Sequence, residues 1–174
     1  MMDKELVLKA KKHNKDAFVE LINEQKTSMY KAAKVILKND EDVADAIQDT
    51  ILDCWEKIQT LRKPEFFKTW LMRILINNCY AIYHKRSRII LNNQCLDGKE
   101  VQGDYEYVEW MDMMNNLNEK QRIVIELYYV EQFKVREIAE ILHIGQSAVK
   151  GRLQSARKKL ETYYDTKQYD QKII

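Results

Sequence analysis

Residues that break helices are scarce in this chain of 174 residues. It contains a single proline, Pro64, and four glycines. Because proline removes a helix hydrogen bond and glycine favours turns, their scarcity favours an all-α fold over a sheet. The length fits one domain or two small ones, and a hydrophobic content of 45% is enough to build a core.

Cysteine and histidine are few and scattered. Cys54, Cys79 and Cys95 form no CxxC pair, and the three histidines are isolated from one another. This spacing argues against a zinc or disulfide framework, and the odd number of cysteines fits a reducing cytosol. Phosphate-binding glycine loops and nucleophile motifs are also missing. The sequence therefore predicts no metal, no cofactor, no small-molecule substrate and no enzymatic activity.

Long apolar runs are missing as well. The N-terminal stretch MMDKELVLKAKKHNKDAF has no apolar core of the signal-peptide type. No uninterrupted apolar run approaches the roughly 20 residues that a bilayer-spanning helix needs. We therefore expect a cytoplasmic protein.

Acidic and basic residues are separated into blocks. The net charge is only +2, which by itself speaks against nucleic-acid binding. However, residues 40–56 hold seven acids and no lysine or arginine, whereas residues 62–88 hold seven bases and one acid. Residues 95–119 are acidic again, with seven acids and one lysine. Because the charges are grouped, the surface is expected to carry distinct acidic and basic regions.

The first acidic block falls on a helix expected over residues 41–59, with Asp40 as its N-cap. Four aspartates form a stripe along it, although like charges three and four residues apart destabilise a helix. Two interpretations are open: a solvated acidic face, or a docking surface for a basic partner. The acidic stripe is Asp42, Asp45, Asp49 and Asp53, and the expected buried side is Val43, Ile47, Ile51, Cys54 and Ile58.

A second helix is expected over residues 66–86, after the loop 60–65, and it carries two neighbouring stripes. One stripe is apolar and should face the core. The other combines rings that stack on unpaired bases, amides that read base edges and cations that hold phosphates. Alternatively, its rings complete the core and the remaining side chains are solvated. The core stripe is Phe67, Leu71, Ile74, Leu75, Asn78 and Ile82; the second is Phe66, Trp70, Arg73, Asn77, Tyr80 and His84, followed by Lys85, Arg86 and Arg88.

Residues 134–160 have the layout of a helix-turn-helix. The first helix runs to about Leu142, and the stretch 143–145 breaks it. The second helix has an apolar seam on one side and polar or basic residues on another, which suits insertion into a DNA major groove. An ordinary helical hairpin with a solvated basic face is the alternative. The first helix buries Val135, Ile138, Ala139 and Leu142, the seam of the second is Val149, Leu153, Ala156 and Leu160, and its polar face holds Ser147, Lys150, Gly151, Gln154, Arg157 and Lys158.

The other segments complete two helical domains. Helices are expected over 3–12, 15–38 and 107–117, and Asn118 should cap another helix in a capping box with Gln121. The predicted organisation is a first domain at 1–88, a linker at 89–106, a second domain at 107–165 and a polar tail at 166–174, with fraying after Leu160.

Three stretches in this order resemble a bacterial RNA polymerase sigma factor of the extracytoplasmic-function group, in the sigma-70 superfamily. They are DVADAIQDTILDCWEKI, FFKTWLMRILINN and NNLNEKQRIVIELYYVEQFKVREIAEILHIGQSAVKGRLQSARKKL. The resemblance covers roughly residues 17–88 and 107–160. It implies two helical domains, called domains two and four, without the domain that larger sigma factors have between them.

The resemblance also implies roles for individual residues. One group docks on core polymerase, a second recognises and melts the −10 element, with a loop at 61–66 that captures a flipped base, and a third reads the −35 element. Here Lys63 and Glu65 replace the Gly and Ser usual in that loop. The docking group is Asp45, Gln48, Asp49 and Leu52; the −10 group is Arg62, Lys63, Phe66, Trp70, Arg73, Asn77, Asn78, Tyr80, His84, Lys85 and Arg86; the −35 group is Arg136, Ser147, Lys150, Gly151, Arg152, Gln154, Arg157 and Lys158.

The function implied is promoter-specific initiation of transcription, for a stress or envelope regulon. The implied partners are the clamp helices and flap region of core RNA polymerase, promoter DNA, and an anti-sigma factor that is membrane-anchored and holds the chain at the inner membrane face. A stand-alone helix-turn-helix regulator is the alternative function. A regulator that binds only duplex DNA has no use for base-stacking rings, so the aromatic stripe distinguishes the two.

Overall fold

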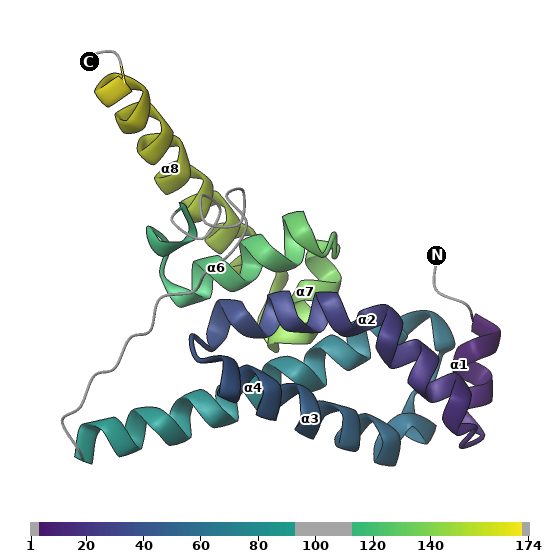
Figure 1. Ribbon diagram of the computed structural model, residues 1–174. Helices are drawn as coiled ribbons and strands as arrows, with labels where there is room; N and C mark the ends of the chain where they lie inside the picture. The colour runs from purple at the N-terminus through teal and green to yellow at the C-terminus, as the bar shows by residue number, and fades with distance from the viewer. Residues whose placement is uncertain (1–3, 93–112, 172–174) are drawn as a thin grey trace. The chain divides into compact units, whose positions relative to one another are not determined.

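The computed structural model describes residues 4–92 and 113–171, and every regular element in these two ranges is a helix (Figure 1). The chain divides into two compact units, as the two-domain interpretation expects. The all-α prediction is confirmed.

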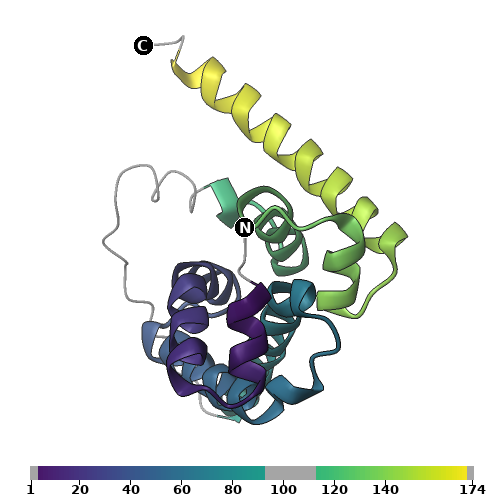
Figure 2. The ribbon, with the colours of Figure 1, turned by 90° about the vertical axis from the view of Figure 1, so that its right-hand side faces the viewer.

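The N-terminal unit is built on three long helices, α2, α3 and α4, which pack against one another. The short helix α1 lies against α2 and the segment that precedes α4 (Figure 2). The elements are α1 Lys4–Lys11, α2 Lys15–Ile36, α3 Asp40–Lys57, the 3-10 turns Ile58–Thr60 and Pro64–Phe66, and α4 Phe67–Asn92.

Asparagines begin the helices α2 and α3. The Asn14 side chain accepts a hydrogen bond from the backbone N–H of Ala17, and the Asn39 side chain accepts one from Glu41 at 2.8 Å. Asp40, the expected cap, is instead the first residue of α3. Its carboxylate pairs with the buried Lys34 ammonium at 2.7 Å, and this contact lowers the pKa of Asp40. The prediction of Asp40 as cap was therefore wrong by one residue.

The buried side of α3 is rotated from the expected one. Val43, Cys54 and Ile58 are buried as predicted, but Ala46 and Thr50 take the places of Ile47 and Ile51, which are half-buried. Small side chains at these positions allow neighbouring helices to approach closely. The Thr50 hydroxyl donates to the Ala46 carbonyl at 2.6 Å, so its burial leaves no unpaired donor.

Helix α4 buries a broader surface than the expected stripe because it packs against both α2 and α3. Phe67, Leu71 and Leu75 are fully buried, as predicted. Met72, Ile76 and Cys79 join them, whereas Ile74, Asn78 and Ile82 are only half-buried. The helix also continues to Asn92, through the first four residues of the predicted linker. The remainder of that linker lies outside the described residues.

The described part of the C-terminal unit starts with a helical turn at 113–115, within the helix expected over 107–117. It continues with α6 Glu119–Ile125, a π-helical turn Glu126–Val130, α7 Val135–Leu142 and α8 Gln146–Gln171. The capping box of Asn118 and Gln121 is confirmed. In the turn between α7 and α8, the backbone takes a positive φ of 51° at His143 rather than at Gly145.

Helix α8 does not end near Leu160, where fraying was expected. It continues as one helix to Gln171 (Figure 2). The prediction relied on the polarity of residues 161–171, but this stretch contains neither glycine nor proline. Polar residues such as glutamate, glutamine and lysine have good helix propensities, so polarity alone does not end a helix.

Candidate nucleic-acid interface and docking surface

The acidic stripe of α3 is divided between the outer surface and the interior of the N-terminal unit. Asp45, Gln48 and Asp49 are exposed, and Leu52 beside them is 56% exposed. We call these four residues the docking patch.

The other two aspartates of the stripe are engaged with α4 and with their own helix. Asp42 is buried and accepts a hydrogen bond from Arg86 Nε at 2.7 Å. Burial raises the pKa of Asp42, and the Arg86 charge opposes this shift. Asp53 accepts hydrogen bonds from Lys57 and, at 3.1 Å, from the Asn78 amide, and both lower the pKa of Asp53. These contacts fix α3 and α4 in an antiparallel register.

The loop before α4 is held by the N-terminal helix. Lys11 Nζ donates to the backbone carbonyl of Leu61 at 2.5 Å, and Leu61 itself is buried. Arg62 and Lys63 remain exposed, and the Phe66 ring at the end of the loop is 46% exposed. The loop therefore presents two cations and one ring on a fixed backbone.

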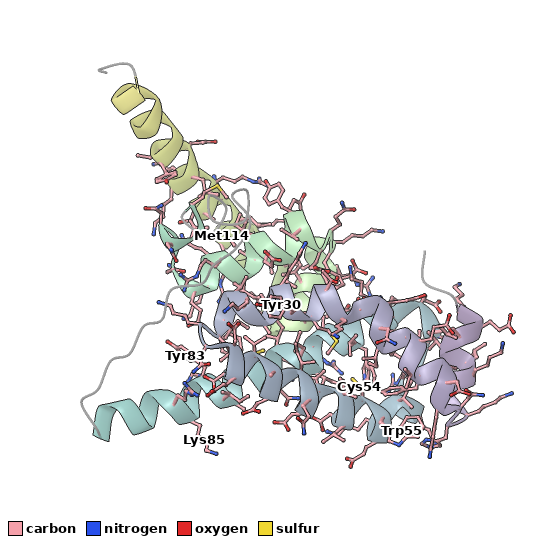
Figure 3. The ribbon with its side chains drawn as sticks, viewed as in Figure 1. Tyr30, Cys54, Trp55, Tyr83, Lys85 and Met114 are labelled. Atoms are coloured by element: carbon pink, nitrogen blue, oxygen red, sulfur yellow. The ribbon has the colours of Figure 1, made fainter. Side chains whose placement is uncertain are left out.

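The aromatic stripe of α4 is accessible along much of its length. Trp70, Arg73 and Tyr80 are half-buried, while Asn77 and His84 are exposed. The Tyr80 and His84 rings stack with centroids 6.1 Å apart. Lys85 and Arg86 are also exposed, and Figure 3 shows Lys85 extending away from α4.

Asn78, like Arg86, belongs to the residues predicted to contact the −10 element and also bonds to α3. Its amide nitrogen lies 3.2 Å from Thr50 Oγ1 and 3.1 Å from Asp53 Oδ2, so it donates toward α3. The structure thus places Asn77 outward and Asn78 inward. The two stripes predicted for α4 already placed Asn78 on the core side and Asn77 on the other side, and the structure agrees with that separation.

On α8 the predicted separation of the two faces is confirmed. Val149, Leu153 and Ala156 are buried and Leu160, the last residue of the seam, is half-buried, whereas Ser147, Lys150 and the other residues of the polar face are exposed. A Cβ built at Gly151 would meet no atom within 4 Å. Outside that face, Arg136 on α7 is exposed and Arg152 is half-buried. The Gln121 amide donates to the Ser155 hydroxyl at 2.8 Å and fixes α8 against α6.

One cluster on this unit was missed by sequence reasoning. Tyr128 and Tyr129, in the π-helical turn, lie against Arg157 of α8. The helical patterns that predict the interface residues single out neither tyrosine. Their proximity to Arg157 depends on the packing of the turn against α8, for which the sequence contains no direct signal.

Other kinds of site find no support in the described residues. Within 4–92 and 113–171, no three side chains among His, Cys, Asp and Glu gather in a way that would hold a metal ion. The helices in those ranges are each too short or too polar to span a bilayer. Burial raises the pKa of the Cys54 and Cys79 thiols to about 12, so neither is a reactive thiolate at neutral pH.

Each of the two units matches a known protein family model. The family model for sigma-70 region 2 matches residues 21–89, and the model for sigma-70 region 4 matches residues 107–160. The RNA polymerase sigma factor SigV of Bacillus subtilis is 27% identical over 154 residues, which span 87% of this chain and 93% of SigV. The sigma factor CnrH of Cupriavidus metallidurans is 26% identical over 180 residues, 94% of each chain.

Solved structures agree with these relatives. CnrH in complex with the cytosolic domain of CnrY matches with a TM-score of 0.71 at 26% identity, covering 94% of this chain and 97% of CnrH. The sigma factor RpoE in complex with the anti-sigma factor NepR, from Bartonella quintana, shares the fold with a TM-score of 0.75 at 21% identity, covering 85% of this chain and 96% of RpoE. The chain belongs to the sigma-70 family, as a sigma factor of the extracytoplasmic-function group.

Proposed function

We propose that this chain binds core RNA polymerase, recognises promoters through a −35 and a −10 element, and initiates transcription of a stress or envelope regulon. One observation carries the proposal. The N-terminal unit combines an exposed acidic and apolar patch on α3 with an accessible aromatic and basic face on α4, and direct hydrogen bonds join the two helices. A stand-alone regulator that binds only duplex DNA needs neither surface.

The docking patch suits a basic partner with an apolar contact point. Asp45 and Asp49 supply the charge, and Leu52 supplies a side chain that gains stability by leaving water. We assign this patch to the clamp helices of the largest polymerase subunit.

The α4 face and the preceding loop suit unpaired DNA. Extracting a base from a duplex costs a few kcal/mol, which stacking on an aromatic ring offsets. Phe66, Trp70 and Tyr80 provide rings, Asn77 provides an amide, and Arg62, Lys63, Arg73, His84, Lys85 and Arg86 surround them with nitrogen donors. Asn78 and Arg86 in addition hold α4 on α3. The chain supplies recognition, and the polymerase supplies the catalysis.

Gly151 allows a direct test of the −35 assignment on α8. Because a Cβ at this position meets nothing in the chain, Gly151→Ala is expected to raise the free energy of unfolding by about 0.5–1 kcal/mol through helix propensity. If DNA approaches the backbone at Gly151, the same methyl group lowers promoter affinity. Chemical denaturation and promoter binding of the holoenzyme measure the two effects. Increased stability with unchanged or increased promoter affinity would contradict a close approach of DNA to this residue.

We further propose that an anti-sigma factor covers these surfaces until a signal releases it, and that a membrane anchor on that factor holds the otherwise cytoplasmic chain at the inner membrane face. The solved CnrH structure, which contains the cytosolic domain of CnrY, supports this proposal.

A run-off transcription assay tests the main function. Core polymerase alone is compared with core polymerase plus this chain on a template library with varied −35 and −10 sequences. We expect specific transcripts only when the chain is added. Promoter binding without transcripts would favour the stand-alone regulator instead.

A further inference from the structure

We infer that Tyr129 is a positioning residue that holds the Arg157 guanidinium ready for a DNA phosphate beside the −35 element. The inference rests on the proposed function and adds to it a residue outside the predicted DNA-binding groups. It starts from the cluster formed by Tyr128, Tyr129 and Arg157.

Two kinds of contact fix the Arg157 side chain. Its Nε donates a hydrogen bond to the Tyr129 hydroxyl at 2.7 Å. Its guanidinium carbon lies 5.7 Å from the centroid of the Tyr128 ring and 5.6 Å from that of the Tyr129 ring, within the range of cation–π attraction. The two rings meet edge to face at 5.0 Å, so each ring fixes the position of the other.

This cluster lies at the surface rather than in the core. The Tyr129 ring is 49% exposed and Arg157 is exposed. Polar contacts between solvated side chains contribute little to folding stability. A stability role therefore explains the arrangement poorly, whereas pre-ordering a long side chain for a ligand explains it well, because an arginine loses much rotamer freedom when it binds.

The position of Arg157 along α8 selects phosphate over a base edge as its ligand. In helix-turn-helix proteins the N-terminal residues of the recognition helix reach the bases. Arg157 lies about 16 Å along the helix axis from Gln146, which begins α8. In homeodomains the C-terminal end of the recognition helix contacts the DNA backbone, and Arg157 occupies the corresponding part of α8. With Nε on the tyrosine hydroxyl, the two terminal nitrogens of the guanidinium remain to grip phosphate oxygens.

Tyr129→Phe is the decisive variant because it removes the hydroxyl and keeps the ring. The full-length chain is bound to core polymerase, and its affinity for promoter DNA is measured at several salt concentrations. We expect Tyr129→Phe to weaken binding about three- to tenfold, by a similar factor on promoters with intact and substituted −35 bases, because phosphate contacts carry no sequence information. Arg157→Gln should weaken binding and lower the slope of log affinity against log salt by about 0.9, the value for one lost phosphate contact. The double variant should bind no worse than Arg157→Gln.

Two controls match these changes elsewhere. Tyr30→Phe removes another tyrosine hydroxyl, which donates to Asp40 in the N-terminal unit, and Lys159→Gln removes another exposed cation of α8. Both should bind promoter DNA like the unmodified chain.

Two results would overturn the inference: wild-type affinity of Tyr129→Phe, whether or not its stability falls, or additive losses of affinity in the double variant. Transcription by the unmodified holoenzyme separates this failure from failure of the proposed function. If the unmodified chain directs transcription while Tyr129→Phe binds promoter DNA with the same affinity as the unmodified chain, the proposed function stands and only the positioning role of Tyr129 is disproved.

Discussion

Replacing Asp49 with lysine is expected to lower the affinity of the chain for core RNA polymerase by about 100-fold or more while leaving the fold intact. Close charge pairs across an interface couple by roughly 1.5–7 kcal/mol, and each 1.4 kcal/mol is a factor of ten in affinity. Reversal also places two like charges together. Asp49 is exposed on α3, so the substitution disturbs no internal contact that the structure shows. Fluorescence titration of labelled chain with core polymerase measures the change.

Glu24→Lys is the matched control for this charge reversal. Glu24 is an exposed acid on α2, so its replacement changes the net charge by the same amount at a place away from the docking patch. We expect it to bind core polymerase nearly as the unmodified chain does. Equal affinities for Asp49→Lys and the unmodified chain would show that α3 does not dock through this patch. An equal loss of affinity in both variants would show that binding to core polymerase responds only to the net charge of the chain.

The second large effect is expected from Phe66→Ala, in promoter opening. A ring that stacks on an unpaired base contributes about 1–3 kcal/mol, so its loss should reduce open-complex formation by roughly 5- to 150-fold. The ring is 46% exposed at the end of the loop, so folding stability should change little. Permanganate reactivity of unpaired thymines near the −10 element reports the opening directly.

A promoter that is already unpaired around the −10 element separates melting from docking. On this template the cost of opening the duplex has been removed, so Phe66→Ala should recover most of the lost activity. Leu8→Ala, which truncates an exposed apolar side chain of similar size on α1, is the control and should open duplex promoters normally. If Phe66→Ala were equally defective on both templates, its ring would contribute to something other than melting.

Local patterns were sufficient to predict most of the fold. The scarcity of proline and glycine indicated the all-α class. Apolar periodicity placed the ends of the described long helices to within about two residues, except the C-terminal ends of α4 and α8, which lie further along the chain. The capping box of Asn118 and Gln121 was predictable because its partners are three residues apart. The end of α8 was not, because polarity is a weak signal for helix termination.

On α3 the candidate site was predictable as a set of residues but not as directions, whereas on α4 the two predicted stripes separated Asn77 from Asn78 correctly. A period of 3.6 residues determines which side chains share a face of a helix. It does not determine how far that face is turned toward a neighbouring helix. The sequence therefore identified the stripe from Asp42 to Asp53, and only packing against α4 turned Asp42 and Asp53 inward and left Asp45 and Asp49 exposed.

Contacts between residues far apart in the sequence could not be predicted from the sequence and are known only from the structure. The sequence alone determined the order of the acidic helix, the aromatic helix and the helix-turn-helix, and with it the sigma-70 resemblance. Only the tertiary structure decided that Asn78 faces Thr50 and Asp53, and that Tyr129 holds Arg157. The physical reason is that a hydrogen bond between residues 25 or 28 positions apart requires two separately formed helices to pack in one register, and no local propensity encodes that register.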